Sequence, residues 1–197
     1  MGDNWWRLHD GDGQHLFSEA VTGLDGRKFC SYRVGGPIDL ALMPTQYESA
    51  VEALKAIETP LTVLGGGCNP DSQSRYSGTT LITKRMMAVE VVDLASGRLR
   101  FDAGVPLARV ATTAQDHGFS GAEFMIGIPG TVGGAIAMNA GAMGQSTDEI
   151  VEGPLSMTAP VARCLPWMPR RWRFRTGTAV STRNGMWCWP GIFVLTG

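Results

Sequence analysis

The segment GIPGTVGGAIAMNAGAMG, Gly127 to Gly144, constrains the fold of this chain more than any other feature of the sequence. It holds six glycines and no charged residue, and the uncharged stretch extends from residue 124 to residue 147. A membrane span needs about 20 predominantly apolar residues in one continuous helix. The glycines, together with Pro129 and Asn139, make such a helix unfavourable. We therefore predict a buried, turning segment of a globular domain that does not span a membrane.

The composition supports a globular chain that binds something close to its backbone. Apolar residues make up 44% of the 197 residues, and 26 residues are glycine. That apolar fraction is enough for a hydrophobic core, and excess glycine favours tight turns and close approaches to a ligand. The N-terminus lacks the apolar region of a signal peptide, which predicts a cytoplasmic protein. The four cysteines form no CxxC pair, so neither a zinc site nor a disulfide framework is predicted.

The charges divide the chain sharply near residue 152. Residues 1–152 carry all 18 acidic residues and 11 Lys or Arg, a net charge of −7, whereas residues 153–197 carry six Arg and no acid. Four of the six tryptophans also lie in this last segment. Arginine interleaved with tryptophan leaves open the interpretation of the tail as a nucleic-acid binder, although the tail has no amphipathic period or recognised module.

Hydrophobic periodicity predicts interspersed helices and strands. Residues 45–58 are predicted to be a helix with Thr45 and Glu48 as a capping box. A second helix is predicted from Pro106 to His117, with Gly118 as its stop. Strands are predicted after Gly36, over 61–64, within 79–94 and over 98–104. This order indicates an α+β fold, and residues 1–29 have no clear pattern.

Three segments place glycines where ordinary packing would not require them: YRVGGP (32–37), LGGGCN (64–69) and the opening segment. Consecutive glycines let several backbone N–H groups converge on one anion, and the missing Cβ lets a diphosphate approach the backbone. The segments match neither the P-loop pattern nor the G-x-G-x-x-G pattern, in which Pro70 would occupy the third glycine position.

Together and in this order, the three segments resemble the UDP-N-acetylenolpyruvoylglucosamine reductase family over residues 30–150. The resemblance implies an FAD-binding domain of the vanillyl-alcohol oxidase type. It also implies reduction of a UDP-linked enolpyruvyl sugar by NADPH through FAD, in the cytoplasmic synthesis of peptidoglycan. The expected ligands are therefore FAD, NADPH and a UDP-sugar, with no nucleic acid, membrane or metal.

The resemblance assigns the FAD-binding residues but no catalytic residue. One wall of the FAD site is expected in the opening segment and the facing loop in LGGGCN. The predicted residues are Arg33, Gly65, Gly66, Gly67, Cys68, Asn69, Ile128, Pro129, Gly130, Thr131, Val132, Gly133, Gly134, Asn139, Ala140 and Gly141.

The chain departs from the family pattern in three places. Cys68 stands where the family favours serine, and the residues after Asn69 read PDSQSRYSG where the family has an apolar run. After residue 152 the family pattern ends. We interpret residues 1–29 as an N-terminal extension, 30–152 as the FAD-binding domain and 153–197 as an aberrant tail in which the substrate domain is largely missing. The composition of the tail suggests a frameshift near residue 153. An inactive flavin-binding fragment of the reductase and a sister FAD oxidase or dehydrogenase of the same fold remain alternatives.

Overall fold

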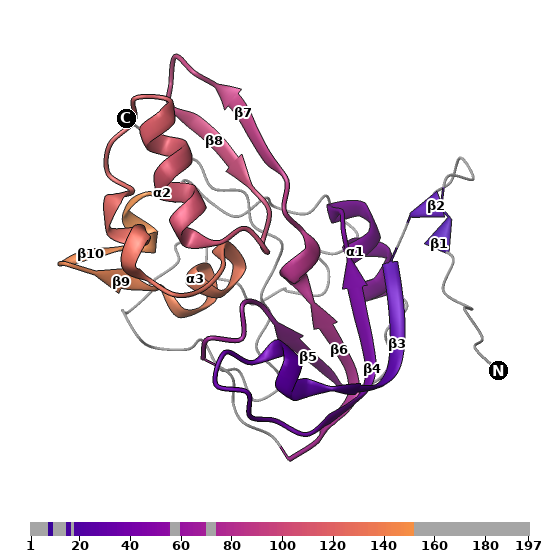
Figure 1. Cartoon of the computed structure of the whole chain (residues 1–197). Coiled ribbons are helices and arrows are strands. Elements are labelled where there is room, and N and C mark those ends of the chain that lie inside the picture. The colour runs from indigo at the N-terminus through magenta and orange to yellow at the C-terminus, as the bar shows by residue number, and fades with distance from the viewer. Residues whose placement is uncertain (1–7, 10–14, 17, 56–59, 70–73, 152–197) are drawn as a thin grey trace, which may run out of the picture.

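The structure is a computed structural model that describes residues 8–9, 15–16, 18–55, 60–69 and 74–151 (Figure 1). The predicted tail, 153–197, lies outside these residues. The described elements form a group built on a four-stranded sheet and a second group built around helix α2. Strands and helices alternate along the chain, so the predicted α+β class is confirmed. The short strands β1 (Leu8–His9) and β2 (His15–Leu16) pair with each other as a separate ribbon.

The main sheet has the strand order β3-β4-β6-β5. Strand β3 is antiparallel to β4, whereas β4, β6 and β5 run parallel to one another. The sheet therefore begins at residue 18, inside the segment predicted as an extension. The strands are β3 (Ser18–Asp25), β4 (Pro37–Pro44), β5 (Leu61–Leu64) and β6 (Tyr76–Ile82).

Alternating side chains of β4 give the sheet two apolar faces, as a period of two requires. Leu42 packs with Leu81 and with Ala53 of helix α1 (Tyr47–Lys55) on one face. Ala41 and Met43 belong with the buried Tyr76 to the cluster on the other face, against which Phe29 of the short helix η1 (Gly26–Phe29) packs. A register shift between Ile38 and Leu40 places Ile38 in this second cluster as well. Helix α1 confirms the predicted helix, although it begins two residues later, and residues 56–59 lie outside the described part of the chain.

The second group is built around α2 (Leu107–Asp116), which starts after Pro106 and ends before Gly118, as predicted. Its apolar side packs on the hairpin β7 (Val89–Asp93) and β8 (Arg98–Phe101), which is connected to the sheet by η2 (Thr83–Arg85). The helices η3 (Glu123–Gly127) and α3 (Val132–Met138) complete this core, and β9 (Gly141–Ala142), β10 (Gln145–Ser146) and η4 (Thr147–Glu149) follow.

The opening glycine segment is partly helical, which corrects the expectation that its glycines would prevent a good helix. Helix α3 has seven residues and contains Gly133 and Gly134. Its glycines are tolerated because tertiary contacts fix them: Gly133 lies so close to Ala103 that an added Cβ would be 2.9 Å from the Ala103 Cβ. Within the described part of the chain, no helix has both the length and the apolar character to cross a membrane.

Candidate functional site

The loop Gly65–Asn69 leaves the sheet at the edge where parallel strands end. Leu64, the last residue of β5, pairs with Ile82, the last residue of β6. The loop therefore begins beside η2, and the Thr83 hydroxyl donates to the Leu64 carbonyl at 3.4 Å. Ligands of parallel sheets commonly bind outside this carboxyl edge, where loops rather than strands present the polar groups.

The segment before α3 is held in place by backbone hydrogen bonds to the start of α2. The Leu107 amide donates to the Gly130 carbonyl at 3.2 Å, and the Val132 amide donates to the Val105 carbonyl at 2.9 Å. The Gly133 amide donates to the Ala103 carbonyl at 2.9 Å. Gly130 itself has a φ of +150°, which glycine adopts at little cost. These contacts fix residues 130–134 as a rigid wall.

The loop and the wall meet at Gly65 and Gly66. A Cβ added to Gly65 would lie 2.9 Å from Thr131 Oγ1, and one added to Gly66 would lie 3.2 Å from Thr131 Cγ2. The Cα of Gly130 is also within 3.4 Å of that second position. The structure thus brings together two of the three glycine segments, which lie more than 60 residues apart in the sequence.

Hydrogen-bonding groups at this junction are left without partners. The Thr131 hydroxyl is buried and forms no hydrogen bond with any described residue. Among the described residues, the amides of Gly66, Gly67 and Gly134 are not donors in any hydrogen bond. Thr131 and Gly67 are buried, whereas Gly66 and Gly134 are half-buried. Because unpaired buried donors are costly, a ligand oxygen bound to the Thr131 hydroxyl or the Gly67 amide would relieve that cost.

The far end of the opening segment is fixed by Asn139. This residue has a φ of +44°, is 2% exposed, and its Oδ1 accepts a 3.0 Å hydrogen bond from the Asp148 amide. The Thr147 amide and hydroxyl both donate to the Ala140 carbonyl, at 3.0 and 2.7 Å. The predicted site residues 139–141 therefore hold η4 against α3, and the Asn139 side-chain oxygen is already used.

The remaining predicted residues divide between the junction and the core. Cys68 Sγ donates weakly to the Gly66 carbonyl at 3.7 Å, and Asn69 and Pro129 are exposed. Val132 is fully buried in the core of the second group and Ile128 packs against that core, so only their backbone faces outward. Whether all these residues contact a cofactor stays a prediction.

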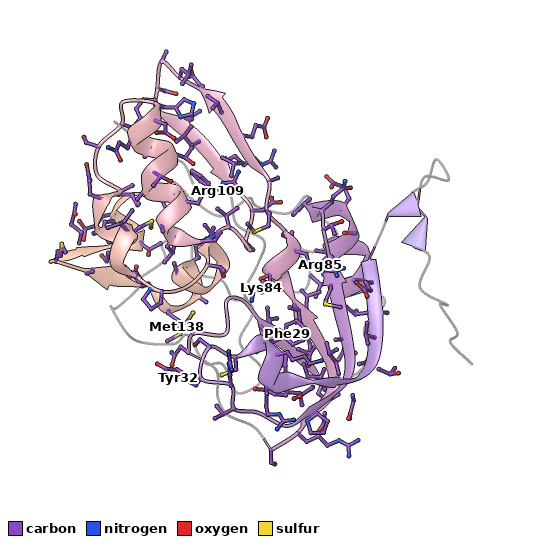
Figure 2. The ribbon with its side chains drawn as sticks, in the orientation of Figure 1. Phe29, Tyr32, Lys84, Arg85, Arg109 and Met138 are labelled. Carbon is purple, nitrogen blue, oxygen red and sulfur yellow. The ribbon has the colours of Figure 1, made fainter. Side chains whose placement is uncertain are left out.

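Arg33 and the first glycine segment lie elsewhere. Gly36 packs on Ser74, where an added Cβ would be 1.7 Å from the Ser74 carbonyl oxygen, so this glycine serves the fold. Arg33 lines a recess with Arg27, Lys28, Cys30 and Ser31, and no residue of 65–69 or 128–141 lines it. Figure 2 shows Tyr32 on the turn that follows η1, and Lys84 on η2.

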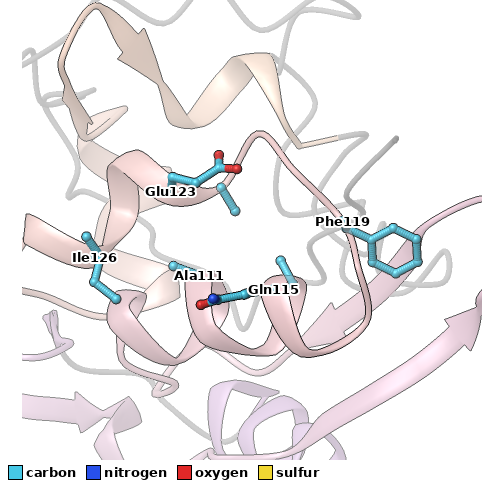
Figure 3. A pocket seen from close by; sticks show the side chains of 7 residues that line it. Ala111, Gln115, Phe119, Glu123 and Ile126 are labelled. Atoms are coloured by element: carbon cyan, nitrogen blue, oxygen red, sulfur yellow. The ribbon is translucent and has the colours of Figure 1, made fainter.

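A further pocket of about 310 Å³ lies between α2 and η3 (Figure 3). Its lining is mainly apolar, with Ala111, Phe119 and Ile126 among the residues. Glu123 at its edge accepts a hydrogen bond from the Gly121 amide at 2.7 Å, a contact within its own turn. This pocket contains no residue of the glycine junction.

Comparison with known proteins shows the family to which the chain belongs. The family model described as an FAD binding domain matches residues 38–159, more than half of the chain. The chain belongs to the FAD-binding domain family. The match includes the parallel strands β4, β5 and β6, the loop after β5, and α3, but not β3, and it extends past residue 152, where the resemblance was predicted to end.

The relatives of this FAD-binding domain confirm the resemblance inferred from the motifs. A UDP-N-acetylenolpyruvoylglucosamine reductase of Rubrobacter xylanophilus is 38% identical over 148 residues, which are 73% of this chain and 49% of that protein. The reductase of Methylococcus capsulatus is 40% identical over 131 residues, 64% of this chain and 42% of that protein. The chain thus spans about half the length of the curated relatives it matches.

A solved structure has the same fold. The UDP-N-acetylenolpyruvylglucosamine reductase (MurB) of Thermus caldophilus aligns with a TM-score of 0.61 at 22% identity, over 91% of this chain and 61% of that one. Together with the family match, this confirms the predicted FAD-binding architecture.

The residues at the junction fit the diphosphate of FAD. Gly65 and Gly66 leave no side chain between the loop and Thr131, and neither the Thr131 hydroxyl nor the Gly134 amide donates a hydrogen bond to any described residue. Backbone amides and hydroxyls are the groups that bind phosphate oxygens without a cationic side chain. The neutral composition of the opening segment is consistent with this role.

Three residues around the loop were not predicted from the sequence. Ser31 donates both its amide, at 2.9 Å, and its hydroxyl, at 3.0 Å, to the Gly67 carbonyl. Thr83 holds the end of β5, and Lys28 lines the recess with Arg33. Their side chains belong to common surface types, so no local pattern distinguishes them before the chain folds.

Proposed function

We propose that this chain binds FAD between the loop 65–69 and the segment 128–141, which contains the wall 130–134. We also propose that it serves the NADPH-dependent reduction of UDP-N-acetylglucosamine enolpyruvate to UDP-N-acetylmuramate. The observation that carries the proposal is the contact of Gly65 and Gly66 with Thr131, where unpaired donors surround a place without side chains. The 38% identity to a reductase supports the choice of reaction. The use of NADPH and a nucleotide sugar is consistent with a cytoplasmic enzyme of peptidoglycan synthesis.

The residues of the junction would bind and orient the cofactor. The Gly134 amide and the Thr131 hydroxyl would donate to phosphate oxygens, and the hydrogen bonds from Leu107, Val132 and Gly133 would keep the wall in position. When bound, FAD would supply the hydride chemistry, accepting a hydride from NADPH and delivering it to the enolpyruvyl double bond. We assign no catalytic side chain within the described residues.

Flavin binding is tested by titrating purified protein with FAD and with riboflavin, which lacks the phosphates, and following flavin fluorescence. We expect Thr131→Val to weaken FAD binding about tenfold, because one charge-assisted hydrogen bond to phosphate is lost. Thr131→Ser keeps the hydroxyl and should bind FAD as the native chain does, and neither variant should change riboflavin binding. A folded native protein that takes up no FAD would refute the proposal.

Turnover is tested separately, by following NADPH oxidation in the presence of the enolpyruvyl UDP-sugar. Substrate-dependent oxidation by the FAD-loaded chain would support the reductase reaction. FAD binding without any such oxidation would favour the flavin-binding fragment over the complete enzyme.

A further inference from the structure

We propose that the recess lined by Arg27, Lys28, Cys30, Ser31 and Arg33 is a second phosphate site, which binds the diphosphate of a nucleotide other than FAD. This inference rests on the proposed function, because that reaction uses two such nucleotides, NADPH and a UDP-sugar. It adds a site that the glycine segments do not provide.

The recess has the size and the position that such a group requires. Its volume is about 660 Å³, and small-molecule sites are commonly about 300–1,000 Å³. It is formed by η1 and by the turn that follows, in which the Arg33 amide donates to the Cys30 carbonyl at 3.0 Å. Among the described residues, the recess is therefore lined by one short stretch of chain, 27–33, which contacts the loop 65–69 through the hydrogen bonds of Ser31 to Gly67.

Two of its three cations lack an acidic partner among the described residues. Arg27 is bound to Asp25, with Nη2 3.0 Å from Oδ2 and Nε 3.0 Å from Oδ1. The side-chain hydrogen bond from Arg27 lowers the pKa of Asp25, so this pair stays ionised and neutral overall. Lys28 and Arg33 enter no ion pair within the described part of the chain. The charge of Lys28 also acts on Asp25, which is already bound to Arg27, so Arg33 and most of the charge of Lys28 are left to complement a diphosphate.

Different residues of the loop 65–69 contact the FAD junction and the segment that forms the recess. Gly65 and Gly66 contact Thr131, whereas Gly67 contacts the η1 end, where an added Cβ would be 1.8 Å from the Phe29 carbonyl oxygen. The Gly67 carbonyl accepts both hydrogen bonds from Ser31. FAD held at Thr131 would therefore leave the recess free for a second ligand beside it.

The turn also presents groups that suit a nucleotide better than free phosphate. Arg33 has a φ of +53°, in the left-handed region that non-glycine residues rarely adopt. Tyr32, beside it, is 72% exposed, and its ring could stack on a base or on a nicotinamide. Figure 2 shows this ring projecting from the turn. The cations would hold the diphosphate while the ring contacts a flat part of the same molecule.

The test uses sodium pyrophosphate as the probe and isothermal titration calorimetry of the full chain, with and without saturating FAD. The double variant Lys28→Gln/Arg33→Gln is compared with Arg85→Gln/Arg109→Gln, which removes two positive charges outside the recess. We expect the first variant to lose pyrophosphate affinity at least tenfold and the control to stay within twofold of the native chain. Circular dichroism verifies folding, and Arg33→Gly, which suits the positive φ, replaces Arg33→Gln if folding fails.

The same variants titrated with UDP and with NADP⁺ show which nucleotide uses the site, because only its affinity will fall. Equal pyrophosphate affinity in the native chain and in the recess variant, or no affinity in either, would overturn the inference. A parallel tenfold loss of FAD affinity would also overturn it, by showing that the recess holds the FAD diphosphate. If the native chain binds pyrophosphate but not FAD, the proposed function fails and the recess stands as an anion site.

Discussion

Gly65 and Thr131 lie so close together that a Cβ on residue 65 would be 2.9 Å from the Thr131 hydroxyl oxygen. Real Cβ atoms essentially never approach another heavy atom this closely, so any other residue at position 65 must displace the Thr131 hydroxyl, either by rotating that side chain or by moving the loop or the wall. This one contact joins the carboxyl edge of the parallel strands to the segment before α3. The geometry of the proposed FAD site depends on it.

Gly65→Ala should therefore weaken FAD binding by about tenfold or more, because it separates the two surfaces that would hold the diphosphate. Flavin fluorescence titration measures the affinity. Gly127→Ala is the matched control, since an added Cβ there meets nothing within 4 Å and it should leave FAD affinity unchanged. Native affinity in Gly65→Ala would show that FAD binds away from Thr131.

Gly67→Ala should destabilise the fold by about 3 kcal/mol or more, since it combines backbone strain with a steric clash. Gly67 has a φ of +69°, and an added Cβ would be 1.8 Å from the Phe29 carbonyl oxygen. Gly23→Ala separates the cost of backbone strain from the cost of the steric clash, because Gly23 has a φ of +66° but no heavy atom within 4 Å of an added Cβ. The control should lose only about 1 kcal/mol. Urea denaturation measures both, and equal losses would mean that the loop yields to the clash.

Asn139→Ala should cost about 2–3 kcal/mol of stability, from an unpaired Asp148 amide and from an alanine at a φ of +44°. Asn139→Gly accepts this φ and loses only the hydrogen bond, so it should be about 1 kcal/mol more stable than the alanine variant. Thermal unfolding compares the two. An alanine variant as stable as the glycine variant would exclude backbone strain as the cause.

Asp102 should make the fold less stable as the pH rises. Burial raises the pKa of Asp102 above its ordinary value of 3.8, although the Ala88 amide, which donates to Oδ2 at 3.1 Å, opposes this shift. A raised folded pKa gives a stabilisation that is complete below pH 3.8 and is lost as the pH rises through the folded value. Asp102→Asn keeps an acceptor for Ala88 without a charge, so it should exceed the native stability at pH 7 but not at pH 3. Urea denaturation at both values measures this, and a constant difference between the two proteins would contradict it.

Local patterns in the sequence predicted the elements whose apolar residues repeat regularly. The alternation of Leu99 and Phe101 with arginines predicted β8, and Pro106 and Gly118 predicted the ends of α2. By contrast, β3 lies within residues 1–29, where no pattern was recognised, because it is defined by its pairing with β4. Helix α3 was missed for a related reason: its glycines have low intrinsic helix propensity, and the contact with Ala103 outweighs it.

The candidate site likewise contains residues that the sequence predicted and residues that it did not predict. The order of the glycine segments predicted the family and the FAD-binding loop. It did not predict that Gly36 would pack on Ser74, or that Ser31 and Lys28 would lie beside the loop. A serine and a lysine become informative only through the groups they face, and the chain must fold before those neighbours exist.

The sequence by itself determined which kind of ligand this protein is expected to bind. Glycine segments in a fixed order remove side chains at the positions where a diphosphate would contact the backbone. Only the tertiary structure decided which segments share one site. Gly65 reached Thr131, whereas Arg33 was placed in a different recess. The physical reason is that conformational freedom belongs to each residue, whereas hydrogen-bond partners and distances depend on strands and helices that are distant in the sequence.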